Sequence, residues 1–144
     1  MLASCHEQPP PPGPGGHQDP AAGPMRLWTF EDDASGTIPS GWSVAETNGD
    51  GTPARWAVTE MEDAQQGARF LQLAESHNSG STYNLLLADD AFPADLQLAV
   101  WLRADSGKED RGGGLVWRAQ DADHYFVTRW NPAEKNLRLY AVEK

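Results

Sequence analysis

Short segments of alternating apolar and polar residues, separated by turn-forming residues, constrain the fold of this chain more than any other feature. Alternation with a period of two places successive side chains on opposite faces of an extended strand. No segment combines a helical period with capping residues at its ends. From Met25 onward the spacing predicts nine strands, at 26–31, 42–46, 54–60, 68–75, 83–89, 95–105, 113–120, 124–131 and 136–144.

Many short strands with regular turn signals predict an all-β fold, and we expect an antiparallel β-sandwich. The segment 95–105 has the clearest division between faces, with the aliphatic Leu96, Leu98, Val100 and Leu102 on one side. Trp101 and Arg103 lie on its other, mixed face. The segments 113–120 and 124–131 are joined by the Asp-rich stretch 119–123, which predicts a hairpin.

The first 25 residues differ in composition from the rest of the chain. They hold most of its eleven prolines and no aromatic residue. Such a composition cannot bury enough apolar surface to fold and is typical of an extended or disordered tether. We therefore expect a tether at 1–25 and one β-sandwich domain at 26–144.

Cys5 is the only cysteine, so an intrachain disulfide is impossible. The string Leu2-Ala3-Ser4-Cys5 resembles a bacterial lipobox. That resemblance implies that Cys5 carries a lipid and that the protein is extracytoplasmic, attached to a bacterial membrane surface without spanning it. A signal needs an apolar stretch of about 7–15 residues before the processing site, so we expect this chain to lack most of its signal peptide. The alternative is a chance match in a protein with a disordered start.

The chain is acidic, with a formal net charge of −10 in 144 residues. Binding to nucleic acid needs a surplus of Lys and Arg on one face, so the charge argues against a nucleic-acid partner. It also argues against simple adsorption to anionic lipid. No apolar run in the sequence is long enough to cross a membrane as a helix.

The order of motifs resembles a known fold family. The stretch "GGGLVWRAQDADHYFVTRWNPAEKNLRLYAVEK" (112–144) and the opening "WTFEDDASGTIPSGW" (28–42) resemble concanavalin A-like lectin and glucanase domains of secreted bacterial lipoproteins. The laminin-G-like and 3-keto-disaccharide hydrolase-like groups are the most similar. The resemblance implies a jelly-roll sandwich larger than this chain, so we expect a fragment with C-terminal strands missing beyond Lys144.

The resemblance also suggests where to look for catalysis and for metal. Glucanases of this family carry a Glu-x-Asp-x-x-Glu strand, and retaining glycosidases need two carboxyl groups about 5–5.5 Å apart. The nearest string, at 60–65, has Glu in place of the Asp and Gln in place of the last Glu, which favours a solvated turn. Similar sandwiches often hold calcium near the chain start, so Glu31, Asp32 and Asp33 are candidate ligands for a structural calcium, and a solvated acidic turn is the alternative.

Carbohydrate binding is the function that the side chains support best. Sugars offer apolar C–H faces and rings of hydroxyls, which proteins bind with flat aromatic rings flanked by hydrogen-bonding side chains. The residues that provide this chemistry are Trp101, Arg103, Arg118, Gln120, Arg129, Trp130, Arg138 and Tyr140. The alternative is that the tryptophans fill the core and the arginine stems cover it.

Three functions therefore remain open at this point. The first is an extracytoplasmic carbohydrate- or glycoconjugate-binding module without catalysis. The second is a glycoside-processing enzyme of the 3-keto-disaccharide hydrolase type, and the third is a laminin-G-like protein-interaction module. A fold analogy cannot choose among them, because function resides in the site.

Overall fold

The computed structural model describes residues 25–49, 51–77, 80–107 and 111–144. They form antiparallel strands and no helix, which confirms the expected all-β class. Cys5 and the tether up to residue 24 lie outside the described residues. The strands are β1 (Trp42–Thr47), β2 (Arg55–Glu60), β3 (Arg69–Glu75), β4 (Tyr83–Ala88), β5 (Gly113–Trp117), β6 (Tyr125–Asn131) and β7 (Asn136–Val142). None of the described residues forms a helix long and apolar enough to span a membrane.

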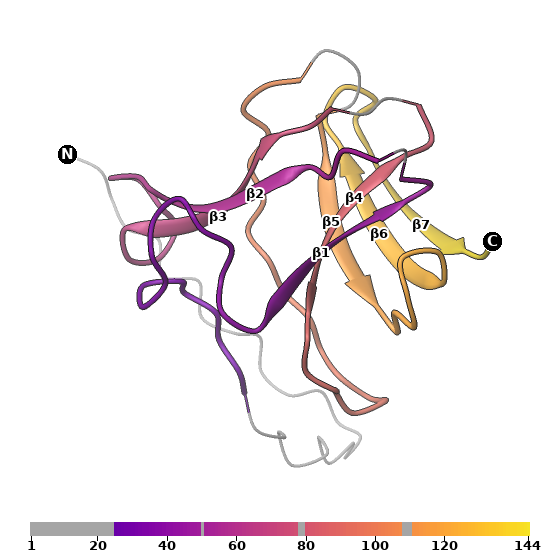
Figure 1. Cartoon of the computed structure of the whole chain (residues 1–144), viewed down its shortest axis with the longest axis horizontal. Coiled ribbons are helices and arrows are strands. Elements are labelled where there is room, and N and C mark those ends of the chain that lie inside the picture. Colours follow the sequence, from indigo (N-terminus) through magenta and orange to yellow (C-terminus); the bar gives the residue numbers. More distant parts are fainter. Residues whose placement is uncertain (1–24, 50, 78–79, 108–110) are drawn as a thin grey trace, which may run out of the picture.

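The strands are distributed over three sheets. β1 pairs with β4, β2 pairs with β3, and β5, β6 and β7 form a three-stranded sheet in that order. The β6–β7 register runs from Tyr125 opposite Val142 to Asn131 opposite Asn136 without a shift. In Figure 1, β2 and β3 extend to one side, while β1 and β4 lie with the three-stranded sheet, of which β7 is the outermost strand.

A buried hydrogen-bonded junction connects β1 with the three-stranded sheet. The Thr47 hydroxyl donates to the carbonyl oxygen of Ala122 at 2.6 Å and lies 2.7 Å from the Tyr125 hydroxyl. Since the single Thr47 proton is used by Ala122, the Tyr125 hydroxyl donates to Thr47. Both Thr47 and Tyr125 are buried, and burial raises the pKa of Tyr125, which keeps its hydroxyl protonated as a donor.

A second group of buried residues consists of Ala54 directly before β2, Ala57 and Val58 on β2, and Leu85 on β4. The backbone of Val58 also holds the loop that precedes β1. Its N–H donates to the carbonyl oxygen of Thr37, and its carbonyl oxygen accepts from the N–H of Gly36, both at 2.8 Å. This loop thus provides β2 with backbone hydrogen bonds that a neighbouring strand would otherwise supply.

The strand expected at 26–31 is not formed. Phe30 has a φ of 63°, in the left-handed region that interrupts an extended strand. The segment is held instead by side chains. The Arg69 guanidinium donates to the carbonyl oxygens of Glu31 and Asp33, and the Glu31 carboxylate accepts from the backbone N–H groups of Ala68 and Arg69, each at 2.9 Å.

The segment 95–105 also forms no strand, although its alternation is the most regular in the sequence. Its aliphatic residues at 96, 98, 100 and 102 are 37–49 % exposed, and Trp101 is 79 % exposed. The segment runs close to β5, since Leu102 Cδ2 lies 3.7 Å from the position that a Cβ on Gly113 would occupy. Alternation creates two faces but does not create a hydrogen-bonded neighbour, and none of the described residues forms a ladder with this segment.

Candidate functional site

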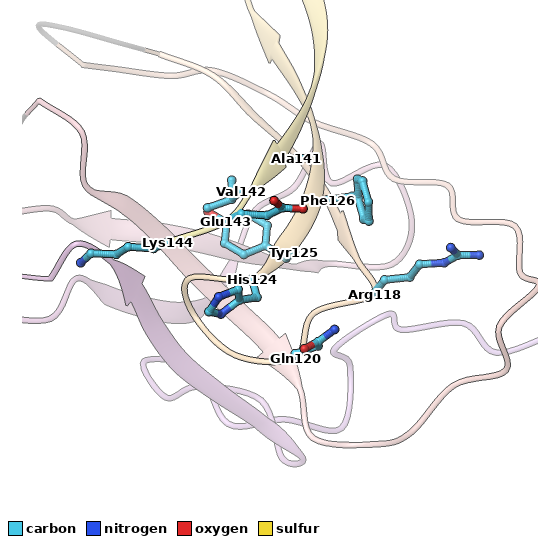
Figure 2. Close-up of a pocket in the computed structure, with 9 residues that line it drawn as sticks. All are labelled: Arg118, Gln120, His124, Tyr125, Phe126, Ala141, Val142, Glu143 and Lys144. Carbon is cyan, nitrogen blue, oxygen red and sulfur yellow. The ribbon is translucent and has the colours of Figure 1, made fainter.

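A surface hollow of about 410 Å³ lies where β6 and β7 meet the β5–β6 connection. This volume is within the range of small-molecule sites in proteins. The residues that line it are Arg118, Gln120, His124, Tyr125, Phe126, Ala141, Val142, Glu143 and Lys144. In the view of Figure 2, Arg118, Gln120 and Phe126 lie on one side of the hollow and Lys144 extends from the other.

The β5–β6 connection has a defined conformation that positions its polar side chains. Arg118 has a φ of 52°, which turns the chain out of β5 directly after Trp117. The Gln120 N–H donates to the carbonyl oxygen of His124 at 3.0 Å, which closes the turn. Inside the turn, the Asp121 carboxylate accepts from the backbone N–H of Asp123 at 2.8 Å, as an Asp in a turn commonly does.

His124 and Asp121 form an ion pair at the rim of the hollow. The Nδ1 atom of His124 lies 2.8 and 2.9 Å from the two oxygens of the Asp121 carboxylate. The hydrogen bond that His124 donates to the Asp121 carboxylate is the main reason that the pKa of His124 is raised above its ordinary value. The pKa of Asp121 is lowered, first by the N–H of Asp123 and then by His124. The imidazolium therefore persists to a higher pH than in a free histidine.

An aromatic pair adjoins these polar groups. Trp117 and Phe126 are opposite each other in the β5–β6 register, and their rings stack with centroids 6.0 Å apart and planes inclined by 20°. Phe126 is exposed and Trp117 is half-buried. The Arg118 guanidinium, which follows Trp117, has no hydrogen-bond or ion-pair partner within the described part of the chain. A flat apolar surface and an uncommitted hydrogen-bond donor thus lie next to each other.

The structure does not bring the eight predicted sugar-binding residues together. Arg118 and Gln120 line the hollow described above. Arg129, Arg138 and Tyr140 form a separate cluster, in which Glu134 lies 3.5 Å from Arg129 and 3.6 Å from Arg138. The Arg129 guanidinium also lies 5.7 Å from the centre of the Tyr140 ring.

The remaining three predicted residues lie elsewhere, and one of them, Trp101 on the segment 95–105, is 79 % exposed. Trp130 lines a second, mostly apolar hollow of about 330 Å³ together with Leu98, Leu102 and Leu137. Arg103 is committed to acidic neighbours, with Nε 2.7 Å from Asp105 and a terminal nitrogen 3.5 Å from Asp63. The expectation of a single aromatic and guanidinium surface is therefore corrected. Adjacent residues of one strand point to opposite faces, so Arg129 and Trp130 cannot serve the same surface.

The acidic residues proposed for calcium are used as loop anchors. Glu31 accepts the two backbone N–H groups described above, and the Asp33 carboxylate accepts the N–H of Ser40 at 2.9 Å. Asp32 is exposed. Across the described ranges, no group of three or more His, Cys, Asp or Glu residues is placed to hold a metal ion.

Sequence reasoning did not select Asp121, His124 or Phe126, of which the last two line the hollow. The spacing Asp-x-x-His within a predicted turn is a signal that could have found the ion pair, because a turn carboxylate reaches the residues two and three positions ahead. Phe126 could have been found from the hairpin register, which sets it opposite Trp117.

Comparison with known proteins gives no relative from which a function could be transferred: no family model, curated protein or solved structure matches this chain. The resemblance to concanavalin A-like domains therefore stays a prediction from the sequence motifs, and the site must be interpreted from its own chemistry.

Proposed function

We propose that this protein is a non-catalytic carbohydrate- or glycoconjugate-binding β-module whose site is the hollow at the β5–β6 connection. The observation that carries the proposal is the juxtaposition of an uncommitted Arg118 guanidinium and the Gln120 amide with the stacked Trp117–Phe126 pair. A pyranose ring stacks its C–H face on an aromatic surface while guanidinium, amide and imidazole groups bond its hydroxyls.

The lining of the hollow favours binding over hydrolysis. Glycoside hydrolases need a pair of carboxyl groups flanking the scissile bond. The residues that line this hollow include one acid, Glu143. Asp121 lies beside it but is engaged by His124 and by the N–H of Asp123. The 3-keto-disaccharide hydrolase alternative therefore depends on the motif resemblance alone.

Titration with a panel of oligosaccharides, followed by tryptophan fluorescence, tests the proposal, since Trp117 adjoins the site. For a glycan that binds, Arg118→Ala should weaken the affinity about tenfold or more, because hydrogen bonds to charged groups contribute about 1.5–3 kcal/mol. Arg55→Ala is the matched control, since Arg55 is an exposed arginine on β2 that pairs with Glu75 at 2.9 Å. Equal effects of the two substitutions, or no response to any glycan, would refute the proposed site.

We also propose that the three sheets belong to a concanavalin A-like jelly-roll sandwich and that the module is extracytoplasmic. The motif order supports the first proposal, and the lipobox-like string before Cys5 supports the second. Lipidation predicts that the protein expressed with its native leader in bacteria incorporates a labelled fatty acid and that Cys5→Ser does not. Equal labelling of both proteins would contradict an anchor on Cys5.

A protein-interaction role of the laminin-G type is the second candidate, and one observation favours it. Leu137 and Leu139 are 67 % and 66 % exposed on the same face of the three-stranded sheet. Solvent-exposed leucines side by side on a sheet face are typical of a docking surface. Substitution of both leucines by serine would abolish such docking and would leave glycan binding at the hollow intact.

A further inference from the structure

We propose that the ligand of this protein is an amphiphilic glycoconjugate, a sugar that carries one alkyl chain. The sugar occupies the hollow at the β5–β6 connection, and the alkyl chain occupies the second hollow beside Trp130, which we call the apolar hollow. This inference rests on the proposed carbohydrate function and specifies the class of glycoconjugate. It follows from the positions of the two hollows, which lie along one face of the three-stranded sheet.

The strand register places the two hollows along the same face. Residues two positions apart on a strand point to the same side of a sheet, and residues opposite each other in the register do so as well. Three rows of side chains therefore cross this face, with Trp117, Phe126 and Ala141 in the first, Leu115, Thr128 and Leu139 in the second, and Gly113, Trp130 and Leu137 in the third. The first row contributes to the hollow at the β5–β6 connection, and the other two contribute to the apolar hollow.

The two hollows are close enough for one small molecule to reach both. Consecutive rows are two residues apart on each strand, which corresponds to about 7 Å. Phe126 in the first row lines one hollow, and Thr128 in the second row lines the other. A sugar stacked on Phe126 therefore needs an apolar substituent that crosses about one row to enter the apolar hollow.

The lining of the apolar hollow fits an alkyl chain and not a second sugar. The hollow of about 330 Å³ lies between the sheet and the segment 95–105. Its walls are mostly aliphatic, with Leu98, Val100 and Leu102 on one side and Leu115 and Leu137 on the other. The polar side-chain groups of its lining are the Thr128 hydroxyl and the Trp130 indole nitrogen. A sugar ring there would leave most of its hydroxyls without hydrogen-bond partners, whereas an alkyl chain has none to satisfy.

The same surface is apolar and open to solvent. Leu137 and Leu139 are 67 % and 66 % exposed, and Leu98, Val100 and Leu102 across the hollow are 37–49 % exposed. A soluble protein rarely exposes so many neighbouring apolar side chains unless they bind a ligand or a partner. The continuity of this surface with the polar hollow selects an occupant that is polar at one end and apolar at the other. Each methylene that such a ligand buries should strengthen its binding about fourfold.

Uncharged alkyl maltosides are the probes, because the protein's formal net charge of −10 disfavours an anionic head group. Maltose and its hexyl, octyl and decyl glycosides are titrated by calorimetry at concentrations below those at which they form micelles. From hexyl to decyl we expect the affinity to rise about fifteenfold for each two methylenes added, until the apolar hollow is filled. Equal affinities for all of these compounds, or failure of decyl maltoside to bind, would overturn the inference.

A sugar-free probe separates this inference from the proposed function. Decyl tetraethylene glycol ether has the same alkyl chain but no sugar, so it should bind about tenfold more weakly than decyl maltoside, and Arg118→Ala should weaken only the maltoside. Equal binding of the two amphiphiles, unaffected by Arg118→Ala, would refute the sugar site and this inference together. An affinity for maltosides that depends on Arg118 but not on alkyl length would refute this inference alone.

Substitutions locate the alkyl chain. Leu137→Asp places a charge in the apolar hollow and should reduce the affinity for decyl maltoside to about that for maltose, with maltose binding unchanged. Leu27→Asp is the matched control, because Leu27 is 60 % exposed and lines neither hollow. Leu102→Asp, on the opposite wall, should repeat the effect of Leu137→Asp, and circular dichroism verifies that each variant is folded. Equal effects of Leu137→Asp and Leu27→Asp would place the alkyl chain elsewhere and would overturn the inference.

Discussion

The buried junction between Thr47 and Tyr125 offers a quantitative test of how the sheets are joined. The Tyr125 hydroxyl donates to Thr47 at 2.7 Å, and Thr47 donates to Ala122 at 2.6 Å. Tyr125→Phe removes one neutral hydrogen bond and leaves the Thr47 donor satisfied. We expect it to lower the free energy of unfolding by about 1 kcal/mol.

Thr47→Val should cost more than Tyr125→Phe. Valine fills the same volume but leaves the Tyr125 hydroxyl and the Ala122 carbonyl oxygen without their partner, which we expect to cost about 2 kcal/mol. The two changes should lower the melting temperature by about 4 and 8 °C, respectively, at about 4 °C per kcal/mol for a domain of this size. The double variant should be more stable than Thr47→Val alone, because it removes the Tyr125 hydroxyl that Thr47→Val leaves without a hydrogen-bond partner.

Thermal and urea unfolding, followed by circular dichroism, measures all four proteins. The order of stability is the decisive result: wild type, then Tyr125→Phe, then the double variant, then Thr47→Val. A double variant less stable than Thr47→Val would mean that the tyrosine hydroxyl does not depend on Thr47, and it would refute the proposed junction.

Two further predictions concern the β5–β6 hairpin. The His124 imidazole should titrate above the ordinary histidine range in a proton NMR titration, and Asp121→Asn should lower that midpoint, because the carboxylate favours the charged ring. The stabilisation from this pair should be present below the ordinary pKa of histidine and be lost as the pH rises through the raised pKa of His124; an unchanged midpoint in Asp121→Asn would contradict the ion pair. Gly114→Ala should separate β5 from β6 and cost about 2 kcal/mol or more in urea unfolding, since its Cβ would overlap the backbone of β6, whereas Gly113→Ala has room and should cost much less.

The hairpin shows how much of the fold the sequence could specify. The expected strands at 113–120 and 124–131 correspond to β5 and β6, because alternation and an Asp-rich turn act locally. The strand expected at 95–105 does not form, because the missing requirement there is not local. Its alternation is the most regular in the sequence, but a strand needs a neighbour in register, and that depends on contacts far along the chain.

The candidate site was predictable only in part. Arg118 and Gln120 were selected for their hydrogen-bonding side chains, and the structure places both at the hollow. Arg129 and Arg138 were selected for the same chemistry, but Glu134 in the β6–β7 turn engages both of them. A list of suitable residue types cannot reveal such pairing, since it arises when the turn folds back between two strands.

Chemical-shift mapping with a bound oligosaccharide tests the central claim most directly. The backbone amide resonances of the isotopically labelled chain are followed as the glycan is added. The account predicts that the largest shifts occur at 117–126 and 141–144, around the hollow. Shifts concentrated at Trp101 and Arg103, or at Arg138 and Tyr140, would place the ligand on another surface and would contradict it.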